Sequence, residues 1–116
     1  MNPYAKYLGP EDHLQKAVLD YIRLQYPTVL VWHTSNEGKR SAFERFKAKW
    51  LGLRSGVSDL ILIHDKKLLA LELKAGKNKP TAAQDDFITE IAHHGFLGAW
   101  ANGFDAAKKT IDDWVV

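Results

Sequence analysis

Three charged residues stand inside or beside sequence runs that otherwise read as buried strands. Asp59 lies near the start of the run SDLILIH at 58–64, and Glu72 and Lys74 end the run LLALELK at 68–74. Buried charges are costly unless they are paired or bound to a metal. Glu72 and Lys74 are two residues apart, so on a strand they share one face. A hairpin between the two runs brings Asp59 beside the end of the second, and we expect the three side chains to meet.

Two carboxylates and an ammonium group suit a hard divalent cation. Mg²⁺ or Mn²⁺ would be held by Asp59 and Glu72, with the backbone carbonyl of Leu73 as a further ligand. The alternative is a buried ion-pair cluster with a purely structural role. The chain has no cysteine, which excludes disulfides, thiolate metal sites and cysteine nucleophiles.

Hydrophobic periodicity and turn residues predict the elements that position these groups. With 116 residues, we expect one domain covering 1–116. The predicted elements are a helix from Pro10 to Pro27, a strand at 28–32, a helix at 39–51, strands at 58–64 and 68–74 joined by a tight turn at 65–67, a helix from Pro80 to Gly95, a strand at 96–101 and a helix at 103–114. The order αβαββαβα predicts an α/β fold with a mixed sheet flanked by helices.

The motifs come in an order that resembles a known nuclease family. SDL followed by ELK looks like the signature of the PD-(D/E)XK nucleases, with Ser58 where proline is common. Within that superfamily the chain is similar to the VRR-Nuc domain, especially its small stand-alone bacterial and phage versions. The resemblance covers nearly the whole chain. It is carried by an acid early in the first helix (Glu11), NEG at 36–38, GVSDL at 56–60, LELK at 71–74 and Gln84 early in the next helix.

The resemblance implies a restriction-endonuclease-like fold and metal-dependent hydrolysis of DNA phosphodiester bonds. Asp59 and Glu72 would hold Mg²⁺ or Mn²⁺, and Lys74 would position the attacking water or stabilise charge on the phosphate. Glu11 would reach the metal directly or through water, although an acid in a first helical turn is also favourable by itself. Gln84 would orient Lys74 or a phosphate, and it also fits a capping box that begins at Thr81.

The expected substrate is branched DNA such as a four-way junction, again by resemblance. The rival interpretation is a nucleic-acid-binding module that kept the fold and lost catalysis, although the intact trio of Asp59, Glu72 and Lys74 argues against it. A sequence-specific restriction enzyme has no support, because nothing resembles a separate recognition domain.

Charge is distributed unevenly along a chain whose net charge is only +2. Six lysines and arginines against two glutamates lie between residues 37 and 54. Such a basic side suits phosphates, although a solvated helix face has the same composition. The predicted nucleic-acid contacts are Asn36, Lys39, Arg40, Lys77 and Lys79. Among the five histidines only His33 is expected near the site, and no second residue at ligand spacing supports a metal-binding role for it.

A single site on each chain raises the question of how a junction is cut on two strands. A symmetric homodimer would present two sites, and Phe46 or Trp50 would then lie at the subunit contact. The alternative is that these aromatic residues fill the core. No apolar run approaches the roughly 20 residues of a membrane helix, and the N-terminus lacks the pattern of a signal peptide. We therefore expect a cytoplasmic protein without a membrane partner, and the resemblance implies that its cell is a bacterium or a phage-infected host.

Overall fold

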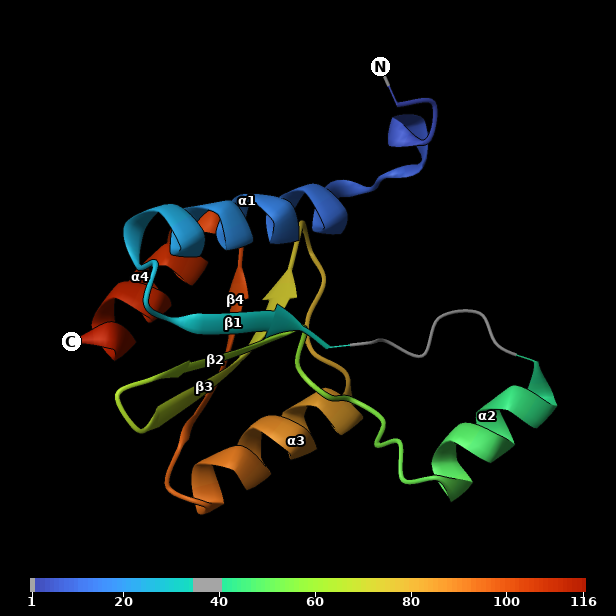
Figure 1. Cartoon of the computed structure of the whole chain (residues 1–116). Coiled ribbons are helices and arrows are strands. Elements are labelled where there is room, and N and C mark those ends of the chain that lie inside the picture. Colours follow the sequence, from blue (N-terminus) through green and yellow to red (C-terminus); the bar gives the residue numbers. More distant parts are fainter. Residues whose placement is uncertain (1, 35–40) are drawn as a thin grey trace.

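The computed structural model describes residues 2–34 and 41–116, arranged as a mixed sheet with helices on both faces (Figure 1). Strands β1, β2 and β3 pair antiparallel, β4 pairs parallel to β3, and the order across the sheet is β1-β2-β3-β4. The elements are a short 3₁₀ helix (Ala5–Tyr7), α1 (Pro10–Gln25), β1 (Leu30–His33), α2 (Ala42–Trp50), β2 (Leu60–His64), β3 (Lys67–Lys74), α3 (Ala82–His93), β4 (Leu97–Asn102) and α4 (Phe104–Val115). The predicted order αβαββαβα is confirmed.

Element boundaries differ from the predictions where turns involve backbone hydrogen bonds. The first strand begins at Leu30 and not at residue 28, because the chain turns after α1 and the Val29 N–H donates to the Tyr26 carbonyl. The hairpin turn consists of Asp65 and Lys66 alone, both with positive φ, and the next residue already belongs to β3. Helix α2 starts after Ser41, whose hydroxyl accepts a hydrogen bond from the Glu44 N–H. The predicted start at residue 39 lies outside the described residues.

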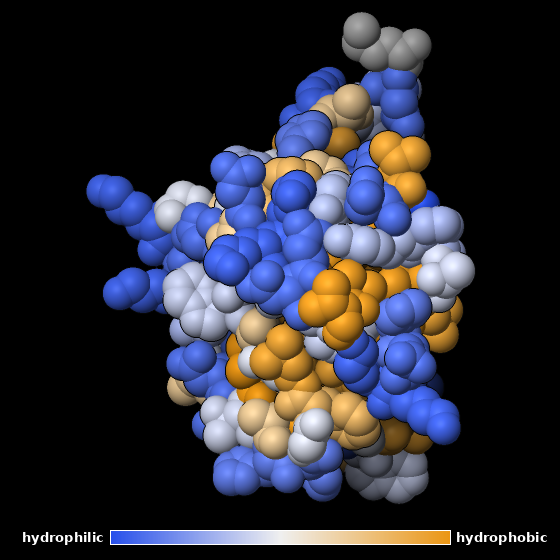
Figure 2. Space-filling view, turned by 90° about the vertical axis from the view of Figure 1, so that its left-hand side faces the viewer, coloured by the Kyte–Doolittle hydropathy of each residue, from blue (hydrophilic) through white to orange (hydrophobic). Residues whose placement is uncertain are grey.

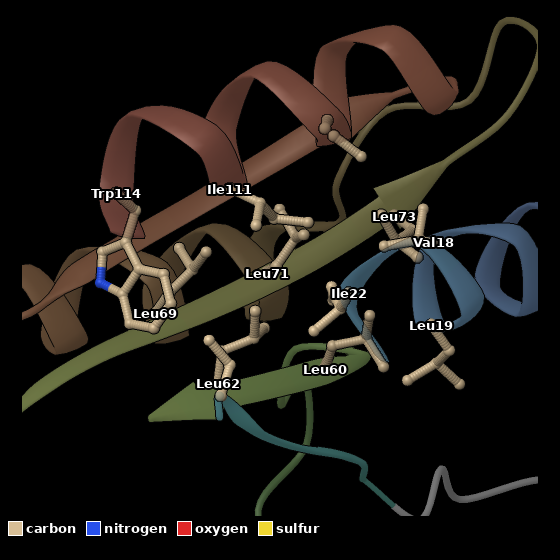
Figure 3. Packing of buried hydrophobic residues seen from close by; sticks show 13 residues of the cluster. Val18, Leu19, Ile22, Leu60, Leu62, Leu69, Leu71, Leu73, Ile111 and Trp114 are labelled. Carbon is tan, nitrogen blue, oxygen red and sulfur yellow. The ribbon is translucent and has the colours of Figure 1, made fainter. Parts of the chain in front are cut away.

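The core lies between the sheet and the helix pair α1 and α4. Alternate residues of β2 and β3 point to this side, and they meet apolar residues of both helices (Figure 3). The largest fully buried side chains are Val18, Ile22, Leu60, Leu62, Leu69, Leu71, Leu73 and Ile111. The intervening residues of β3, including Glu72 and Lys74, therefore project toward the opposite face, which α3 partly covers.

Helix α1 is fastened to α4 by a polar cluster at the edge of this core. The hydroxyl groups of Tyr21 and Tyr26 donate to Asp112 Oδ1 over 2.5 and 2.7 Å, and Lys108 Nζ donates to the other carboxylate oxygen over 2.9 Å. These bonds, the one from Tyr21 first, lower the pKa of Asp112 to about 2. The cluster fixes α1 against the body of the protein, and with it the position of Glu11 in the first turn.

Two of the regions that expose apolar side chains are the hairpin end of the sheet and helix α2. At the hairpin end of the sheet, apolar residues gather on the face seen in Figure 2, and the exposed ones in this region include Leu30, Ile63, Phe96 and Leu97. The second part is α2, which lies away from the sheet (Figure 1). Among residues 2–34 and 41–116, no helix is long and apolar enough to cross a membrane.

The segment before β2 packs along α3. Arg54 forms an ion pair with Glu90 of α3 over 2.5 Å. Gly56 follows with φ of +80°, and a Cβ placed on it would lie 2.4 Å from the Ala83 carbonyl carbon and 2.7 Å from the Gln84 nitrogen. Only glycine fits so close to backbone atoms. This contact sets the distance between α3 and the residues that lead to Asp59.

We therefore predict that Gly56→Ala destabilises the protein by more than about 2 kcal/mol, because it combines backbone strain with a clash. Gly52→Ala is the matched control: Gly52 has φ of +102° but nothing within 4 Å of an added Cβ. The control should lose only about 1 kcal/mol, the cost of the left-handed backbone. Urea unfolding measures both, and equal losses in the two variants would contradict the close contact.

Candidate functional site

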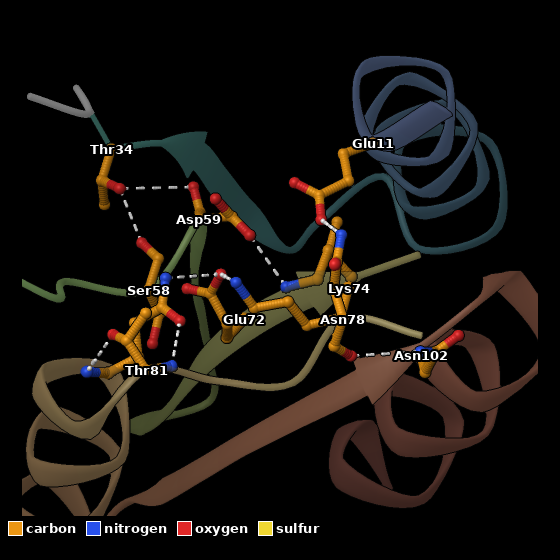
Figure 4. A network of polar contacts seen from close by, with 11 residues as sticks. Glu11, Thr34, Ser58, Asp59, Glu72, Lys74, Asn78, Thr81 and Asn102 are labelled. Atoms are coloured by element: carbon orange, nitrogen blue, oxygen red, sulfur yellow. Dashed lines mark hydrogen bonds and ion pairs between the residues drawn. The ribbon is translucent and has the colours of Figure 1, made fainter. Parts of the chain in front are cut away.

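The structure brings Asp59, Glu72 and Lys74 together at one end of the sheet. Leu60 pairs with Leu71, so Asp59, the residue before β2, lies level with Glu72 on the neighbouring strand. The Lys74 Nζ lies 3.4 Å from Glu72 Oε2. Figure 4 shows the two carboxylates and Lys74 in one cluster, which Glu11 approaches from α1. The hairpin pairing expected from the sequence thus produces the predicted cluster.

Glu72 is the most buried charged group of the cluster, with 2% of its surface exposed. Its Oε2 accepts a hydrogen bond from Gln84 Nε2 over 3.1 Å, while Oε1 has no hydrogen-bond partner among the described residues. Burial is the main reason that its pKa is raised to about 8. The charge of Asp59 raises it further, and Lys74 opposes both effects. An unpartnered, buried carboxylate oxygen beside a second carboxylate is an arrangement that a bound cation would stabilise.

Asp59 is held at both its carboxylate and its backbone. Its Oδ2 accepts a hydrogen bond from the Leu73 N–H over 2.8 Å, and its carbonyl accepts from the Thr34 N–H and from His33 Nδ1 over 2.9 and 3.0 Å. The Lys74 carbonyl accepts from the Gly103 N–H on the β4 side. Successive carbonyls of a strand alternate in direction, so that of Leu73 points toward Asp59, where a further metal ligand was predicted.

The side chain of Gln84 has two contacts at once. Its Oε1 accepts from the Thr81 N–H over 2.9 Å, and the Thr81 hydroxyl accepts from the Gln84 N–H, which completes a capping box at the start of α3. The amide nitrogen remains for Glu72. The capping box expected from the sequence is therefore present, whereas the amide bonds Glu72 and reaches Lys74 only through the Glu72 oxygen that the two side chains share.

Glu11 lies in the exposed first turn of α1 and faces the same region. Its Oε1 accepts a hydrogen bond from Asn78 Nδ2 over 3.2 Å. A polar cavity of about 130 Å³ separates this turn from Asp59, and its lining residues are Glu11, Asp12, Gln15, His33, Asp59 and Leu73. Glu11 and His33 are therefore close to Asp59, as expected. Both line this cavity from the side of the sheet that α1 covers.

The predicted nucleic-acid contacts are only partly described. Lys77 and Lys79 are exposed in the loop between β3 and α3, and this loop is held by Asn102, whose Nδ2 donates to the Gly76 carbonyl over 2.8 Å. Both lysines follow Lys74 closely in the sequence. Asn36, Lys39 and Arg40 lie outside the described residues.

The residues present fit a magnesium or manganese ion that keeps most of its waters. Within residues 2–34 and 41–116, no three histidine, aspartate or glutamate side chains lie close enough to enclose a metal by themselves. Mg²⁺ is commonly bound by one or two carboxylates together with waters and substrate oxygens. Asp59 and Glu72 supply that number, and the free Oε1 of Glu72 is a ready ligand.

The contacts of two residues that support the site were not foreseen from the sequence, although Gly56 belongs to the GVSDL motif. Thr34 follows β1 and contacts the Asp59 peptide, and Gly56 sets the approach of α3. Gly56 had a signal, since a glycine just before a strand indicates a tight turn or a close contact. Thr34 had none, because its role depends on which peptide group lies opposite.

The raised pKa of Glu72 predicts how stability depends on pH in the absence of metal. In the folded protein the pKa of Glu72 is raised to about 8, whereas the ordinary pKa of a glutamate side chain is 4.5. The folded state then binds more protons than the unfolded state, so this group's contribution to the free energy of unfolding falls as pH rises from about 5 to 8. Urea unfolding in a chelator should show wild type losing stability relative to Glu72→Gln over this range. A constant difference between pH 5 and 9 would contradict the shift.

Comparison with known proteins identifies the family and agrees with the fold. The family model of the VRR-NUC domain matches residues 9–105. A solved structure described as a VRR_NUC domain protein superposes with a TM-score of 0.74 at 23% identity, covering 93% of this chain and 89% of the other. A second, described as a VRR_NUC domain, gives 0.62 at 22% identity, covering 90% and 96%. Among curated proteins, none matches significantly. Since the family model spans most of the sequence, the chain belongs to the VRR-NUC family of nuclease domains.

Proposed function

We propose that this VRR-NUC domain is a DNA endonuclease that hydrolyses phosphodiester bonds with Mg²⁺ or Mn²⁺. The observation that carries the proposal is the buried Glu72 beside Asp59, with one carboxylate oxygen unpartnered in the described structure. A purely structural cluster would satisfy the hydrogen bonds of its buried carboxylate. The unpartnered Oε1 of Glu72 instead favours either a proton or a cation at this position.

Each residue of the cluster has a role that follows from its contacts. Asp59 and Glu72 would hold the metal. When bound, it would polarise the phosphate and lower the pKa of a water. Lys74 places a positive charge within 3.4 Å of Glu72, where it can stabilise negative charge that develops on the phosphate. Gln84 keeps the Glu72 carboxylate in one orientation. Glu11 faces Asp59 across the cavity, from which it can bind the same ion through water.

The carboxylates provide the direct test. Asp59→Asn and Glu72→Gln keep the side-chain shape and remove the charge that binds the cation, so we predict that cleavage falls by more than about 100-fold. Binding to DNA should survive, because the basic loops are untouched. The assay compares labelled duplex, flap, single-stranded and four-way DNA, with and without Mg²⁺ or Mn²⁺.

Asp113→Asn is the matched control for these variants. Asp113 is an exposed carboxylate of α4 that pairs with Lys109, so its loss should leave cleavage unchanged. Near-normal cutting by Asp59→Asn or Glu72→Gln would refute the assignment of the site. Wild-type protein that binds DNA but cuts none of the four substrates with either metal would favour the catalytically silent module.

We further propose a homodimer acting on branched DNA, and α2 supplies the surface. Phe43, Phe46 and Trp50 follow one another at helical spacing and are 68, 65 and 76% exposed. No other element of the described chain packs closely on α2, so these rings do not fill the core. An apolar stripe of this kind is typical of a protein contact. A second copy that covers it would place two sites in one particle, as a junction with two strands to cut requires.

Light scattering at micromolar concentration tests the dimer. We predict a mass of twice 13.1 kDa for wild type and about half of that for the double variant Phe46→Gln with Trp50→Gln. Leu24→Gln is the control, because Leu24 is 86% exposed on α1, outside the proposed interface. A wild-type mass near 13.1 kDa with and without junction DNA would rule out the dimer. A double variant that stays dimeric would exclude α2 as the contact.

A further inference from the structure

The end of β1 holds the peptide groups on both sides of Asp59. The Thr34 N–H and the His33 Nδ1 both donate to the Asp59 carbonyl. The Thr34 hydroxyl donates to the Ser58 carbonyl over 2.6 Å and lies 3.4 Å from that of Asp59 (Figure 4). Thr34 is half-buried, which limits competition from water for these bonds.

These contacts begin where the regular pairing of β1 and β2 ends. The last cross-strand pair is His33 with Leu60, so Asp59 lies one residue beyond the ladder. Without further bonds its peptide group would be free to rotate, and its carboxylate would move with it. The Leu73 N–H fixes the carboxylate from β3, and the β1 end fixes the peptide from the other side. Asp59 is thereby held between two strands.

The bond of His33 also fixes which ring nitrogen carries hydrogen. A carbonyl oxygen only accepts hydrogen bonds, so Nδ1 must be protonated to donate to Asp59. His33 therefore uses Nδ1 on the backbone of the site.

We propose that His33 and Thr34 are positioning residues that fix the Asp59 peptide so that its carboxylate is oriented for the metal. The inference rests on the proposed function only in taking Asp59 as a metal-binding group. Residues that orient a ligand without touching the metal commonly change metal affinity by 10–100-fold. The side-chain hydrogen bonds of Thr34 and His33 should therefore each affect Mn²⁺ binding, even in the absence of DNA.

Paired variants separate the hydrogen bonds from the shape of the side chains. Thr34→Val keeps the branched shape and removes the hydroxyl, whereas Thr34→Ser keeps the hydroxyl. His33→Asn places an amide nitrogen close to the position of Nδ1, whereas His33→Gln reaches only the position of Nε2. Thr110→Val is the control, because the Thr110 hydroxyl donates to the Ala106 carbonyl on α4, in the same way but outside the site.

Mn²⁺ affinity is measured by calorimetry on the full chain without DNA, and thermal melting confirms that each variant is folded. We expect Thr34→Val and His33→Gln to bind Mn²⁺ about tenfold more weakly, and Thr34→Ser, His33→Asn and Thr110→Val to bind it as wild type does. In cleavage assays the first two should need more metal for half-maximal rate, and saturating metal should restore most of the rate.

The outcomes separate this inference from the proposed function. Unchanged Mn²⁺ affinity in Thr34→Val and His33→Gln would overturn the positioning role, even if wild type cleaves DNA. Retained affinity in His33→Gln with loss in His33→Asn would assign the role to Nε2 and overturn the inference for His33. If wild type binds Mn²⁺ through Asp59 but cuts no DNA, the nuclease proposal fails while weaker binding by Thr34→Val still supports the positioning role.

Discussion

The burial of the Glu72 carboxylate next to Asp59 is the constraint on which the rest of the site depends. Two like charges at the end of a buried strand are stable only with compensation, and each neighbour supplies part of it. Lys74 contributes a positive charge, and Gln84 contributes an amide hydrogen bond. The cost of burial that remains is visible in the raised pKa of Glu72 and in its Oε1, which has no hydrogen-bond partner among the described residues, and on this ground we propose a cation site here.

The sheet and the central cluster could be predicted from sequence because their signals are local and strong. Charged residues interrupt apolar strands at few places in a chain, and the short hairpin leaves little choice of register for Asp59 and Glu72. Helices α1 and α3 begin where Pro10 and Thr81 indicate, since capping residues act within one turn. The same local logic made the capping box of Gln84 foreseeable, but not its bond to Glu72.

Features that depend on distant parts of the chain could not be predicted in this way. The contact of Thr34 with Asp59 spans 25 positions and depends on where the β1–β2 ladder stops. The apolar stripe of α2 is likewise exposed because no other element of the described chain packs closely on it, which depends on the arrangement of distant elements. Amphipathic periodicity predicts that a helix has an apolar face, but not which surface covers it.

The two contacts of Gln84 place a requirement on this position that the helix start alone does not impose. A capping box is satisfied equally by glutamate or glutamine, because only a side-chain oxygen is needed for the Thr81 N–H. Glutamate here would cap α3 just as well, yet it would replace the donor to Glu72 with a third carboxylate. The variant with glutamate would keep its fold and α3, but the added negative charge would raise the pKa of the neighbouring Glu72 further. An amide at position 84 therefore both caps α3 and bonds Glu72, whereas an acid there would only cap the helix.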